Sequence, residues 1–436
     1  MTPFDLVALE PLIAAEEIAL RRAGATKGDR VGWIGLNDPS MIALLFACER
    51  LGLTLVPLNW RLAADELQWI AEDAGLRLVR YGPSSGAVAP RPVPTEARCD
   101  ALLIGYTSGT MGRPKGAMLS AAALHANAEN AKQVFELTPD DHVLTVLPLF
   151  HVGGLNIQTV PALLAGARVT LLPKFDPDGF FDAVRAHRPT LTLLVPAVMA
   201  ALVNHPRWPA EDLSSLRAIG AGSSEVPMAL IQAFHDRGIP VQQVYGMTET
   251  GPIAIAQTRA EALAAPGSIG RPAPLCEARI SATSEIEIRG PNVMSSYWGR
   301  PEETAEALHG GWFRTGDVGH QGTEGRFWFT DRLKRVIISG GENIYPAELE
   351  RVLHEVPGLR ECAVIGRADP RWGEVPIAVV VVTPEFDEAV MAAHFERRLA
   401  RFKHPRAVIR IAELPRTALG KVQAEKLRAL TEGAGV

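Results

Sequence analysis

A hydroxyl- and glycine-rich loop at residues 106–116 has the composition of a phosphate-binding segment. Its sequence reads Tyr-Thr-Ser-Gly-Thr-Met-Gly-Arg-Pro-Lys-Gly. Glycines let backbone N–H groups approach an anion, the hydroxyls add further donors, and Lys115 supplies a positive charge. The loop is not a Walker A motif, which consists of a glycine, four residues and then Gly-Lys-Ser/Thr. Counting four residues from Gly105 leads to Thr110 and not to a glycine, and Pro114 precedes the lysine. A solvated turn between two strands is the alternative, since these residue types are common in loops.

A second candidate follows the apolar run at 241–245, which predicts a strand. Tyr245, Thr248 and Glu249 place an aromatic ring, a hydroxyl and a carboxylate within five residues. These groups suit base stacking, a phosphate contact and a magnesium site respectively. The alternative is a core tyrosine followed by a Thr/Glu cap at a helix N-terminus.

Three further polar residues have both a chemical and a structural explanation. Asp317 lies in a glycine-flanked turn, His151 ends a predicted strand beside a glycine pair, and Lys421 follows a glycine near the C-terminus. On local grounds an aspartate such as Asp317 is often just a turn former, and a packed aromatic ring and a solvated lysine are the favoured explanations of His151 and Lys421. The glycines at 220 and 222 do not form a dinucleotide fingerprint, because Glu225 stands where a third small residue is required.

The elements that must position these residues alternate between helix and strand. Helical spacing at 8–22 and 63–74 alternates with short apolar runs at 31–35 and 53–58. Such alternation predicts a parallel sheet covered by helices. The last hundred residues instead predict a small α+β module whose longest helix lies at 387–402. The predicted fold class is therefore α/β, with a large N-terminal part and a smaller α+β part at the C-terminus.

Bulk composition argues against several classes of protein. The chain has 436 residues, 47% of them apolar and 21% charged, which suits a globular protein of about two to three domains. A net charge of −5 without a basic run disfavours nucleic-acid binding. Four scattered cysteines predict neither a zinc site nor disulfides, and favour a reducing compartment. No apolar run approaches the ~20 residues of a membrane span, and the N-terminus is unlike a signal peptide, so we expect a cytoplasmic protein.

The whole string at 106–116 closely resembles the signature loop of the adenylate-forming superfamily, which includes acyl-CoA synthetases, amino-acid adenylation domains and luciferases. Six strings in all are similar to this superfamily in identity, order and spacing. The departures are Met111, where a second threonine is common, and an N-terminal region shorter than the family usually has. The resemblance implies an AMP-binding domain with layered, parallel-rich sheets over 1–330 and a small mobile α+β lid domain over 331–436. The charged run at 331–335 is expected to be an exposed hinge around Asp331.

The resemblance also implies roles for single residues. The implied ATP- and AMP-binding residues are Thr107, Ser108, Gly109, Thr110, Lys115, Gly222, Ser223, Ser224, Tyr245, Gly246, Thr248, Asp317 and Arg332. Among them, Tyr245 matches the ring stacked on adenine, Thr248 a phosphate contact, and Asp317 the ligand of both ribose hydroxyls. Glu249 matches the magnesium ligand. Lys421 matches the catalytic lysine, Lys334 a lysine near the nucleotide phosphate, and His151, Gly340 and Gly341 border the acyl pocket and the coenzyme A tunnel.

The implied reaction is ATP-dependent formation of an acyl-adenylate, followed by transfer of the acyl group to coenzyme A with release of AMP and pyrophosphate. Amino-acid adenylation domains carry an aspartate where this chain has His151, so an amino-acid substrate is disfavoured. The favoured substrate is an aromatic or medium-chain acid. Within residues 155–159, Asn156 and Gln158 hint at a polar or ring-bearing acid if they face the acyl pocket. Two alternatives stay open: an acyl-AMP ligase that loads a carrier protein, and a binding-only relative. No pattern predicts the oligomeric state.

Overall fold

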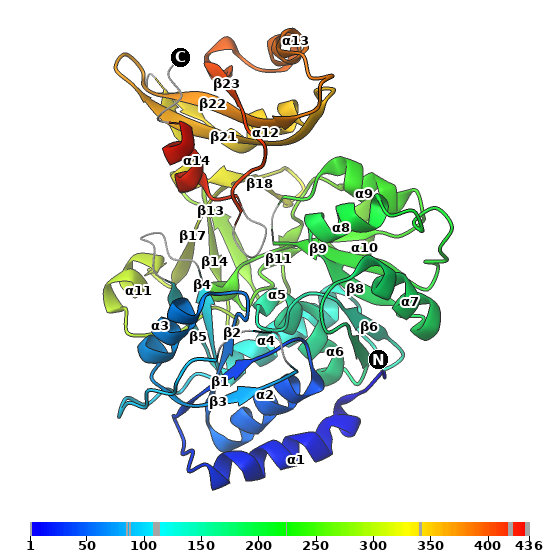
Figure 1. Ribbon diagram of the computed structural model, residues 1–436, viewed down its shortest axis with the longest axis vertical. Coiled ribbons are helices and arrows are strands. Elements are labelled where there is room, and N and C mark those ends of the chain that lie inside the picture. Colours follow the sequence, from blue (N-terminus) through cyan, green and yellow to red (C-terminus); the bar gives the residue numbers. More distant parts are fainter. Residues whose placement is uncertain are drawn as a thin grey trace. The chain divides into compact units, whose positions relative to one another are not determined.

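The structure, a computed structural model, describes residues 2–83, 86, 89–107, 114–223, 225–339, 342–416 and 422–431 (Figure 1). The chain divides into two compact units. The first contains Met1–Arg279, Glu287–Arg314 and Gln321–Trp328, and the second contains Ile280–Ile286, Thr315–His320 and Phe329–Val436. Over the ranges just given, no helix is both long enough and apolar enough to cross a membrane.

One sheet of the first unit carries the predicted phosphate loop. Its six strands run in the order β15-β5-β4-β2-β1-β3. They are β1 (Arg30–Ile34), β2 (Thr54–Leu58), β3 (Leu76–Tyr81), β4 (Leu103–Thr107), β5 (Lys115–Leu119) and β15 (Ser296–Tyr297). Strand β1 pairs in parallel with β2 and β3, and β2 with β4, whereas β4 and β5 form an antiparallel hairpin. The parallel pairing predicted from helix–strand alternation is confirmed, and β1 and β2 are buried along their whole length.

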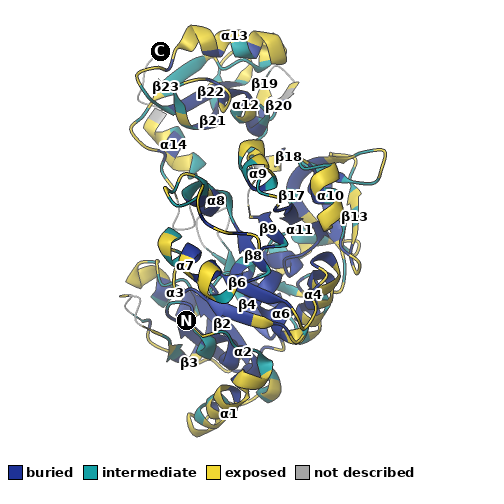
Figure 2. Ribbon diagram, turned by 90° about the vertical axis from the view of Figure 1, so that its right-hand side faces the viewer, coloured by how far each residue is buried: buried dark blue, intermediate teal, exposed yellow. Residues whose placement is uncertain are grey.

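Three helices accompany this sheet: α1 (Leu6–Arg22), α2 (Pro39–Leu51) and α3 (Ala64–Ala74). Helix α2 begins where Asp38 accepts a hydrogen bond from the backbone N–H of Ser40 and Pro39 takes the first helical position. It ends at Gly52, which has φ 65°, a conformation that glycine adopts without strain. In Figure 2, β2 has the buried colour, whereas much of α1 has the exposed colour.

The second sheet of the first unit has seven strands in the order β12-β11-β10-β9-β8-β6-β7. They are β6 (His142–Thr145), β7 (Arg168–Leu171), β8 (Leu191–Leu194), β9 (Ala218–Gly222), β10 (Val241–Tyr245), β11 (Ile255–Ala256) and β12 (Arg271–Pro272). The five strands from β7 to β10 are parallel. The accompanying helices are α4 (Ala121–Val134), α5 (Val152–Gly154), the π-helix η1 (Leu155–Thr159), α6 (Val160–Leu164), α7 (Pro177–His187), α8 (Pro196–Val203), α9 (Met228–His235) and α10 (Arg259–Ala264).

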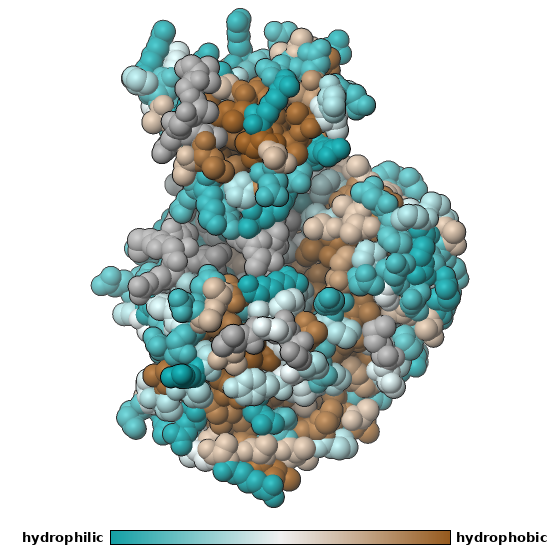
Figure 3. Space-filling view, viewed as in Figure 1, coloured by the Kyte–Doolittle hydropathy of each residue, from teal (hydrophilic) through white to brown (hydrophobic). Residues whose placement is uncertain are grey.

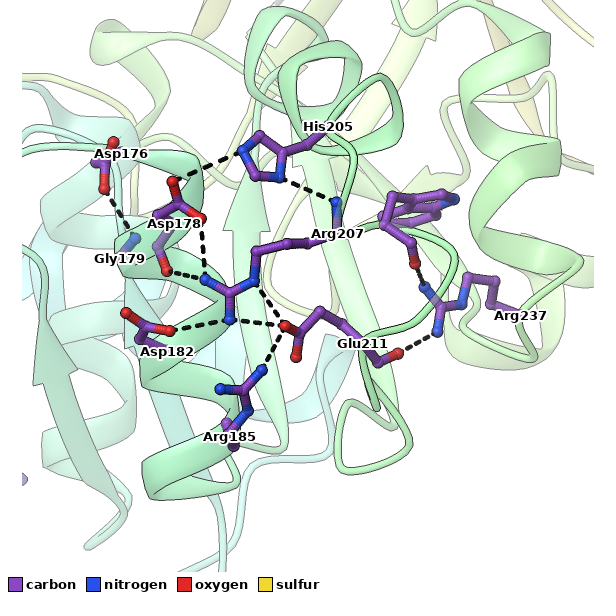
Figure 4. Close-up of polar contacts among 10 residues, drawn as sticks. Asp176, Asp178, Gly179, Asp182, Arg185, His205, Arg207, Glu211 and Arg237 are labelled. Carbon is purple, nitrogen blue, oxygen red and sulfur yellow. Dashed lines mark hydrogen bonds and ion pairs between the residues drawn. The ribbon is translucent and has the colours of Figure 1, made fainter.

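A network of ion pairs fastens the segment after α8 onto α7 (Figure 4). The Arg207 guanidinium donates to Asp178 and Asp182 of α7, each at 2.9 Å. It also donates from Nε to Glu211 Oε1 at 2.7 Å, and Arg185 donates to the same oxygen at 2.6 Å. Because Glu211 is 9% exposed, its carboxylate depends on these two arginines for its charge partners. The network therefore joins residues 207–211 to α7.

A third sheet has the strand order β13-β14-β17-β16, with β18 also paired to β17. Its strands are β13 (Glu277–Ile280), β14 (Glu285–Arg289), β16 (Leu308–His309), β17 (Trp312–Gln321) and β18 (Phe327–Arg332), and α11 (Pro301–Ala307) precedes β16. The residue ranges of the two units divide the strands of this sheet between them.

The rest of the second unit is a five-stranded sheet with order β20-β19-β22-β21 and β23 paired to β22. Its elements are β19 (Ile337–Ser339), β20 (Glu342–Ile344), α12 (Pro346–Leu353), β21 (Leu359–Asp369), β22 (Gly373–Val382), α13 (Glu388–Arg398), β23 (Ala407–Arg410) and α14 (Ala424–Thr431). Buried apolar side chains form two clusters in this unit, one containing Ile337 and Phe395 and the other Ile377 and Leu427. Figure 3 shows apolar residues gathered over β21 and β22 on the visible face of this unit. The predicted α+β module is confirmed.

The charged run at 331–335 differs from the exposed hinge that we expected. Asp331 is fully buried, and its Oδ2 accepts a hydrogen bond of 2.6 Å from the backbone N–H of Ala347 in α12. Pro346, the first residue of α12, has no N–H, so Asp331 meets the first free donor of that helix end. The expectation of exposure is therefore wrong for Asp331, although the neighbouring Arg332 is exposed.

Candidate active site

The predicted phosphate loop joins β4 to β5, and the antiparallel register sets Thr107 directly opposite Lys115. The Thr107 hydroxyl donates to the Lys115 carbonyl oxygen at 3.4 Å. Both residues are half-buried, whereas Ser108, Gly109 and Thr110 lie outside the described residues. The hairpin thus holds the two ends of the loop side by side, as a loop that closes around an anion requires.

The base of this hairpin is anchored to α3 through Asp73. The Tyr106 hydroxyl donates to Asp73 Oδ2 at 2.7 Å, and Arg300 donates to Oδ1 at 2.6 Å. The indole N–H of Trp298 donates to the Asp73 carbonyl oxygen at 2.9 Å. Burial, and then the charge of Asp73, hold the pKa of Tyr106 well above its usual range, so the hydroxyl stays a donor. The start of the loop is therefore fixed by contacts that local sequence does not reveal.

Glu249 lies beside the same hairpin. It belongs to the short 3-10 turn η2 (Thr248–Thr250) after β10 and is 7% exposed. The Tyr297 hydroxyl donates to Glu249 Oε1 at 2.9 Å, and Lys115 Nζ lies 5.2 Å from the centre of the Tyr297 ring. Burial, and then the Glu249 charge, hold the pKa of Tyr297 well above its usual range. A cation, a phenol and a carboxylate from three separate segments thus converge.

Thr248 is pressed against the strand that leads into the loop. It is 7% exposed, and a Cβ built on Gly105 of β4 would lie 2.5 Å from its Cγ2. Only glycine at 105 allows so close an approach. The structure therefore brings together two segments that were predicted separately from sequence, one containing Thr107 and Lys115 and the other Thr248 and Glu249.

Glu249 suits a magnesium ion that is shared with a bound phosphate. Among the residues that the structure describes, no group of three or more His, Cys, Asp or Glu side chains could hold a metal ion by itself. Mg²⁺ usually keeps several waters and is bound through one or two carboxylates together with substrate phosphates. A single buried carboxylate beside a predicted phosphate loop supplies that kind of donor set.

The predicted adenine contacts lie at one edge of the second sheet. Strands β9 and β10 are parallel, with Gly222 paired to Val244, so Ser223 and Tyr245 leave the sheet at the same edge. Ligands of open α/β sheets bind outside the carboxyl ends of the strands. Tyr245 is 9% exposed, Ser223 has a φ of 74°, and Gly246 follows Tyr245 directly. Ser224 lies outside the described residues.

The predicted ribose contacts pair with each other in the second unit. Asp317 is 1% exposed, and its Oδ1 lies 2.7 Å from Arg332 Nε. The Asp317 backbone N–H donates to Thr315 Oγ1 at 3.1 Å, which fixes the turn. The arginine side chain is 48% exposed and therefore accessible to a ligand. The guanidinium therefore supplies a positive charge beside a buried carboxylate.

His151 caps the short helix α5, its Nδ1 accepting a hydrogen bond of 3.1 Å from the Gly153 backbone N–H. The π-helix η1 follows immediately. Asn156 and Gln158 of η1 are each 2% exposed, so the segment expected to line the acyl pocket is buried.

The remaining predicted residues belong to the second unit and are not described. Gly340, Gly341 and Lys421 lie outside the described residues, as does the Lys334 side chain. The loop that contains Lys421 is flanked by an antiparallel bridge between Arg416 and Val422.

Sequence reasoning missed Tyr297 and Asp73. Tyr297 lies in a two-residue strand, and only the long-range pairing of β15 with β5, with Tyr297 opposite Ala117, carries it to Glu249. Asp73 looks like any acidic residue on an amphipathic helix. No periodic or motif signal distinguishes either residue.

Two family models match the chain. The model described as AMP-binding enzyme matches residues 18–298, and the model described as AMP-binding enzyme C-terminal domain matches residues 348–421. Among curated relatives, the indoleacetate–CoA ligase of Aromatoleum aromaticum is 47% identical, over 94% of this chain and 90% of the relative. A feruloyl-CoA synthase of an Amycolatopsis species is 40% identical, over the same shares of the two chains.

Solved structures show the same fold. The o-succinylbenzoate CoA synthetase MenE from Bacillus subtilis, in complex with the acyl-adenylate intermediate OSB-AMP, aligns with a TM-score of 0.87 and 29% identity, covering 97% of this chain and 92% of that one. ATP-bound MatB from Rhodopseudomonas palustris aligns with a TM-score of 0.89 and 30% identity, covering 98% and 93%.

Proposed function

The chain belongs to the AMP-binding enzyme family, and we propose that, as an ATP-dependent carboxylate–CoA ligase of this family, it activates an aromatic carboxylic acid. The fold class, the enzyme class and the use of ATP, Mg²⁺ and coenzyme A predicted from sequence are confirmed. An aromatic acid is favoured because relatives that span most of the chain are named for indoleacetate, feruloyl and 2-succinylbenzoate groups, each of which contains a ring.

One observation carries the proposed nucleotide site: Lys115, Thr248, Glu249 and Tyr297 converge at the β4–β5 hairpin. Lys115 and the loop donors Thr107 to Thr110 would hold the β- and γ-phosphates, and Thr248 would donate to a phosphate oxygen. Glu249, oriented by Tyr297, would hold Mg²⁺, which when bound neutralises charge on the leaving pyrophosphate. Electrostatic stabilisation and alignment are what adenylation requires of these residues.

The proposed nucleoside contacts complete the site. Tyr245 would stack on adenine, with Gly222, Ser223, Ser224 and Gly246 around it. Asp317 and Arg332 would bind the ribose hydroxyls, the carboxylate as acceptor and the guanidinium as donor.

In the proposed mechanism, the acid's carboxylate oxygen attacks the α-phosphorus of ATP, and the bond to pyrophosphate breaks. Lys421 would lie between the two anions and reduce their repulsion, with Lys334 near the phosphate. The coenzyme A sulfur, losing its proton, then attacks the acyl carbon of the mixed anhydride, and AMP leaves. We propose that residues 1–330 form the AMP-binding domain and that residues 331–436 form a mobile lid. After adenylation the lid would withdraw Lys421 and present the Gly340–Gly341 edge to the active site for the thioester step. His151 would lie beside the acyl group.

We propose a reducing compartment, the cytoplasm, for this enzyme. Cys48, Cys99, Cys276 and Cys362 are all free and buried. Burial raises the pKa of each of these thiols, which keeps them protonated and unreactive.

The test is exchange of labelled pyrophosphate into ATP with a panel of aromatic and medium-chain acids, followed by thioester detection with coenzyme A as the sole thiol. We expect exchange and thioester with aromatic acids, and loss of both in Glu249→Gln. Glu211→Gln changes a similarly buried carboxylate of the network in Figure 4 and should retain exchange. Exchange without a thioester would indicate a carrier-protein ligase, and ATP binding without exchange a binding-only relative.

A further inference from the structure

Two buried carboxamides in the π-helix η1 lack the partners that buried amides normally have. Asn156 and Gln158 are each 2% exposed, and among the described residues none of their side-chain N and O atoms has a hydrogen-bond partner. The adjacent Thr159 hydroxyl, by contrast, donates to the Gly154 carbonyl oxygen at 2.6 Å. Buried polar groups in folded proteins are nearly always satisfied, so an orphaned amide points to a partner from outside the chain.

The two carboxamides lie in different surroundings. Residues two positions apart on a helix do not face each other. Gln158 lines a cavity of about 10 Å³, together with Gly153, Gly154, Thr159, Leu193 and residues 143–147. Asn156 is not among the lining residues, and its backbone carbonyl accepts a hydrogen bond of 2.6 Å from Asn127 Nδ2. Of the two carboxamides, Gln158 is therefore the one that borders this cavity.

The position of Gln158 fits the acyl end of an acyl-adenylate. A Cβ built on Gly220 would lie 3.1 Å from Gln158 Nε2 and 2.9 Å from Leu193 Cδ1, so the amide lies against β9. Gly220 precedes the proposed adenine contact Gly222 by two residues, roughly 7 Å at the usual rise of a strand. Because the acyl group is bonded to the α-phosphate, it must lie close to the nucleotide. The cavity is also lined by the glycines that follow His151.

On the premise of the proposed function, we propose that Gln158 is a specificity-determining residue that hydrogen-bonds a polar substituent on the ring of the acid. A carboxamide both donates and accepts, so it can pair with a ring N–H or a ring hydroxyl. A cavity of about 10 Å³ is close to the volume that one water requires, which matches a single polar substituent rather than a whole ring. An unsubstituted ring would leave the amide unpaired and is therefore the poorer substrate.

The test compares kcat/KM for aromatic acids in matched pairs that differ in one polar group. Suitable pairs are para-hydroxyphenylacetate against phenylacetate, and indoleacetate against naphthaleneacetate. A site built to hydrogen-bond a substrate group rejects the analogue without it far more strongly than an apolar pocket does, so we expect wild type to prefer the polar member of at least one pair by about 100-fold or more. In Gln158→Met, which keeps the side-chain length, this ratio should fall to within about 10-fold of unity.

Asn156→Leu is the matched control, because it removes an equally buried and equally unpartnered amide that does not line the cavity. It should keep the wild-type ratio. Thermal melting of each variant separates a folding defect from a change in selectivity, and Gln158→Leu provides a second apolar replacement. The inference is overturned if Gln158→Met forms thioester with the wild-type preference for the polar acid, which is the result expected if one buried water satisfies the amide. It is also overturned if Asn156→Leu, and not Gln158→Met, abolishes that preference. A thioester with an unchanged ratio refutes only this inference, whereas no thioester with any acid refutes the proposed function as well.

Discussion

Replacing Tyr297 by phenylalanine should weaken Mg²⁺ binding and so raise the Mg²⁺ concentration that adenylation requires. The substitution removes one hydroxyl, which donates to Glu249 Oε1 at 2.9 Å, and leaves the ring that faces Lys115 in place. Glu249 is 7% exposed, so water cannot readily replace the lost donor. The carboxylate then loses the contact that fixes its orientation toward a metal ion.

The size of the effect follows from two independent magnitudes. A hydrogen bond to a charged group contributes about 1.5–3 kcal/mol. Loss of an outer-shell partner of a metal ligand typically costs about 10–100-fold in metal affinity, which is about 1.4–2.7 kcal/mol at 1.36 kcal/mol per tenfold. Because the two ranges agree, we expect the Mg²⁺ concentration for half-maximal pyrophosphate exchange to rise by about 10-fold or more in Tyr297→Phe.

The assay is pyrophosphate exchange over a range of free Mg²⁺ at saturating ATP, with calorimetric titration of Mg²⁺ into the nucleotide complex as a second readout. Tyr106→Phe is the matched control, since it removes a buried hydroxyl that donates to Asp73 and not to Glu249. It should leave the Mg²⁺ requirement unchanged even if ATP binding weakens. A Mg²⁺ requirement that stays constant or falls in Tyr297→Phe would refute the reasoning, because the hydroxyl would then compete with the metal for Oε1.

Three further predictions concern packing, protonation and helix capping. Gly105→Ala should lower the melting temperature and weaken ATP binding, because the added Cβ would lie 2.5 Å from Thr248 Cγ2 and overpacking costs about 1–3 kcal/mol. Calorimetry with and without ATP measures the melting temperature and the affinity for ATP. Burial lowers the pKa of His142 from 6.5 to about 4, so its contribution to stability is present above pH 6.5 and is lost as the pH falls toward 4. Urea unfolding should therefore show a free energy of unfolding that falls with pH across this range, and His142→Asn should make that fall smaller. Asp331→Ala should destabilise the C-terminal region by about 0.5–2 kcal/mol, as loss of a helix cap does, with faster amide exchange at Ala347.

The sequence was sufficient where the signal is local and periodic. An aspartate followed by a proline is a typical helix start, and α2 begins at Pro39 with Asp38 as its cap. Apolar runs in helix–strand alternation predicted buried parallel strands, and the parallel pairings of β1 with β2 and β3 bear this out. Each of these features depends only on residues a few positions apart.

The sequence was not sufficient where a contact depends on register between distant segments. Strand β15 is too short to show a period, yet its pairing with β5 decides that Tyr297 reaches Glu249. The charged run after Phe329 suggested exposure, but an aspartate can be buried when a helix end supplies a donor. That donor, the Ala347 N–H, lies sixteen positions further along the chain and could not be anticipated from local composition.

The alternation of side chains along a strand explains why positions 331 and 332 differ so sharply. Both end β18, and successive residues of a strand point to opposite faces. Asp331 therefore turns inward to the end of α12, while Arg332 turns to the buried carboxylate of Asp317. Asp331 couples this point of the chain to α12, and Arg332 couples it to the proposed ribose ligand Asp317. Any rotation of the backbone that preserves the Asp331–Ala347 hydrogen bond must carry Asp331 and α12 together, because a turn between them would leave a buried carboxylate without its donor.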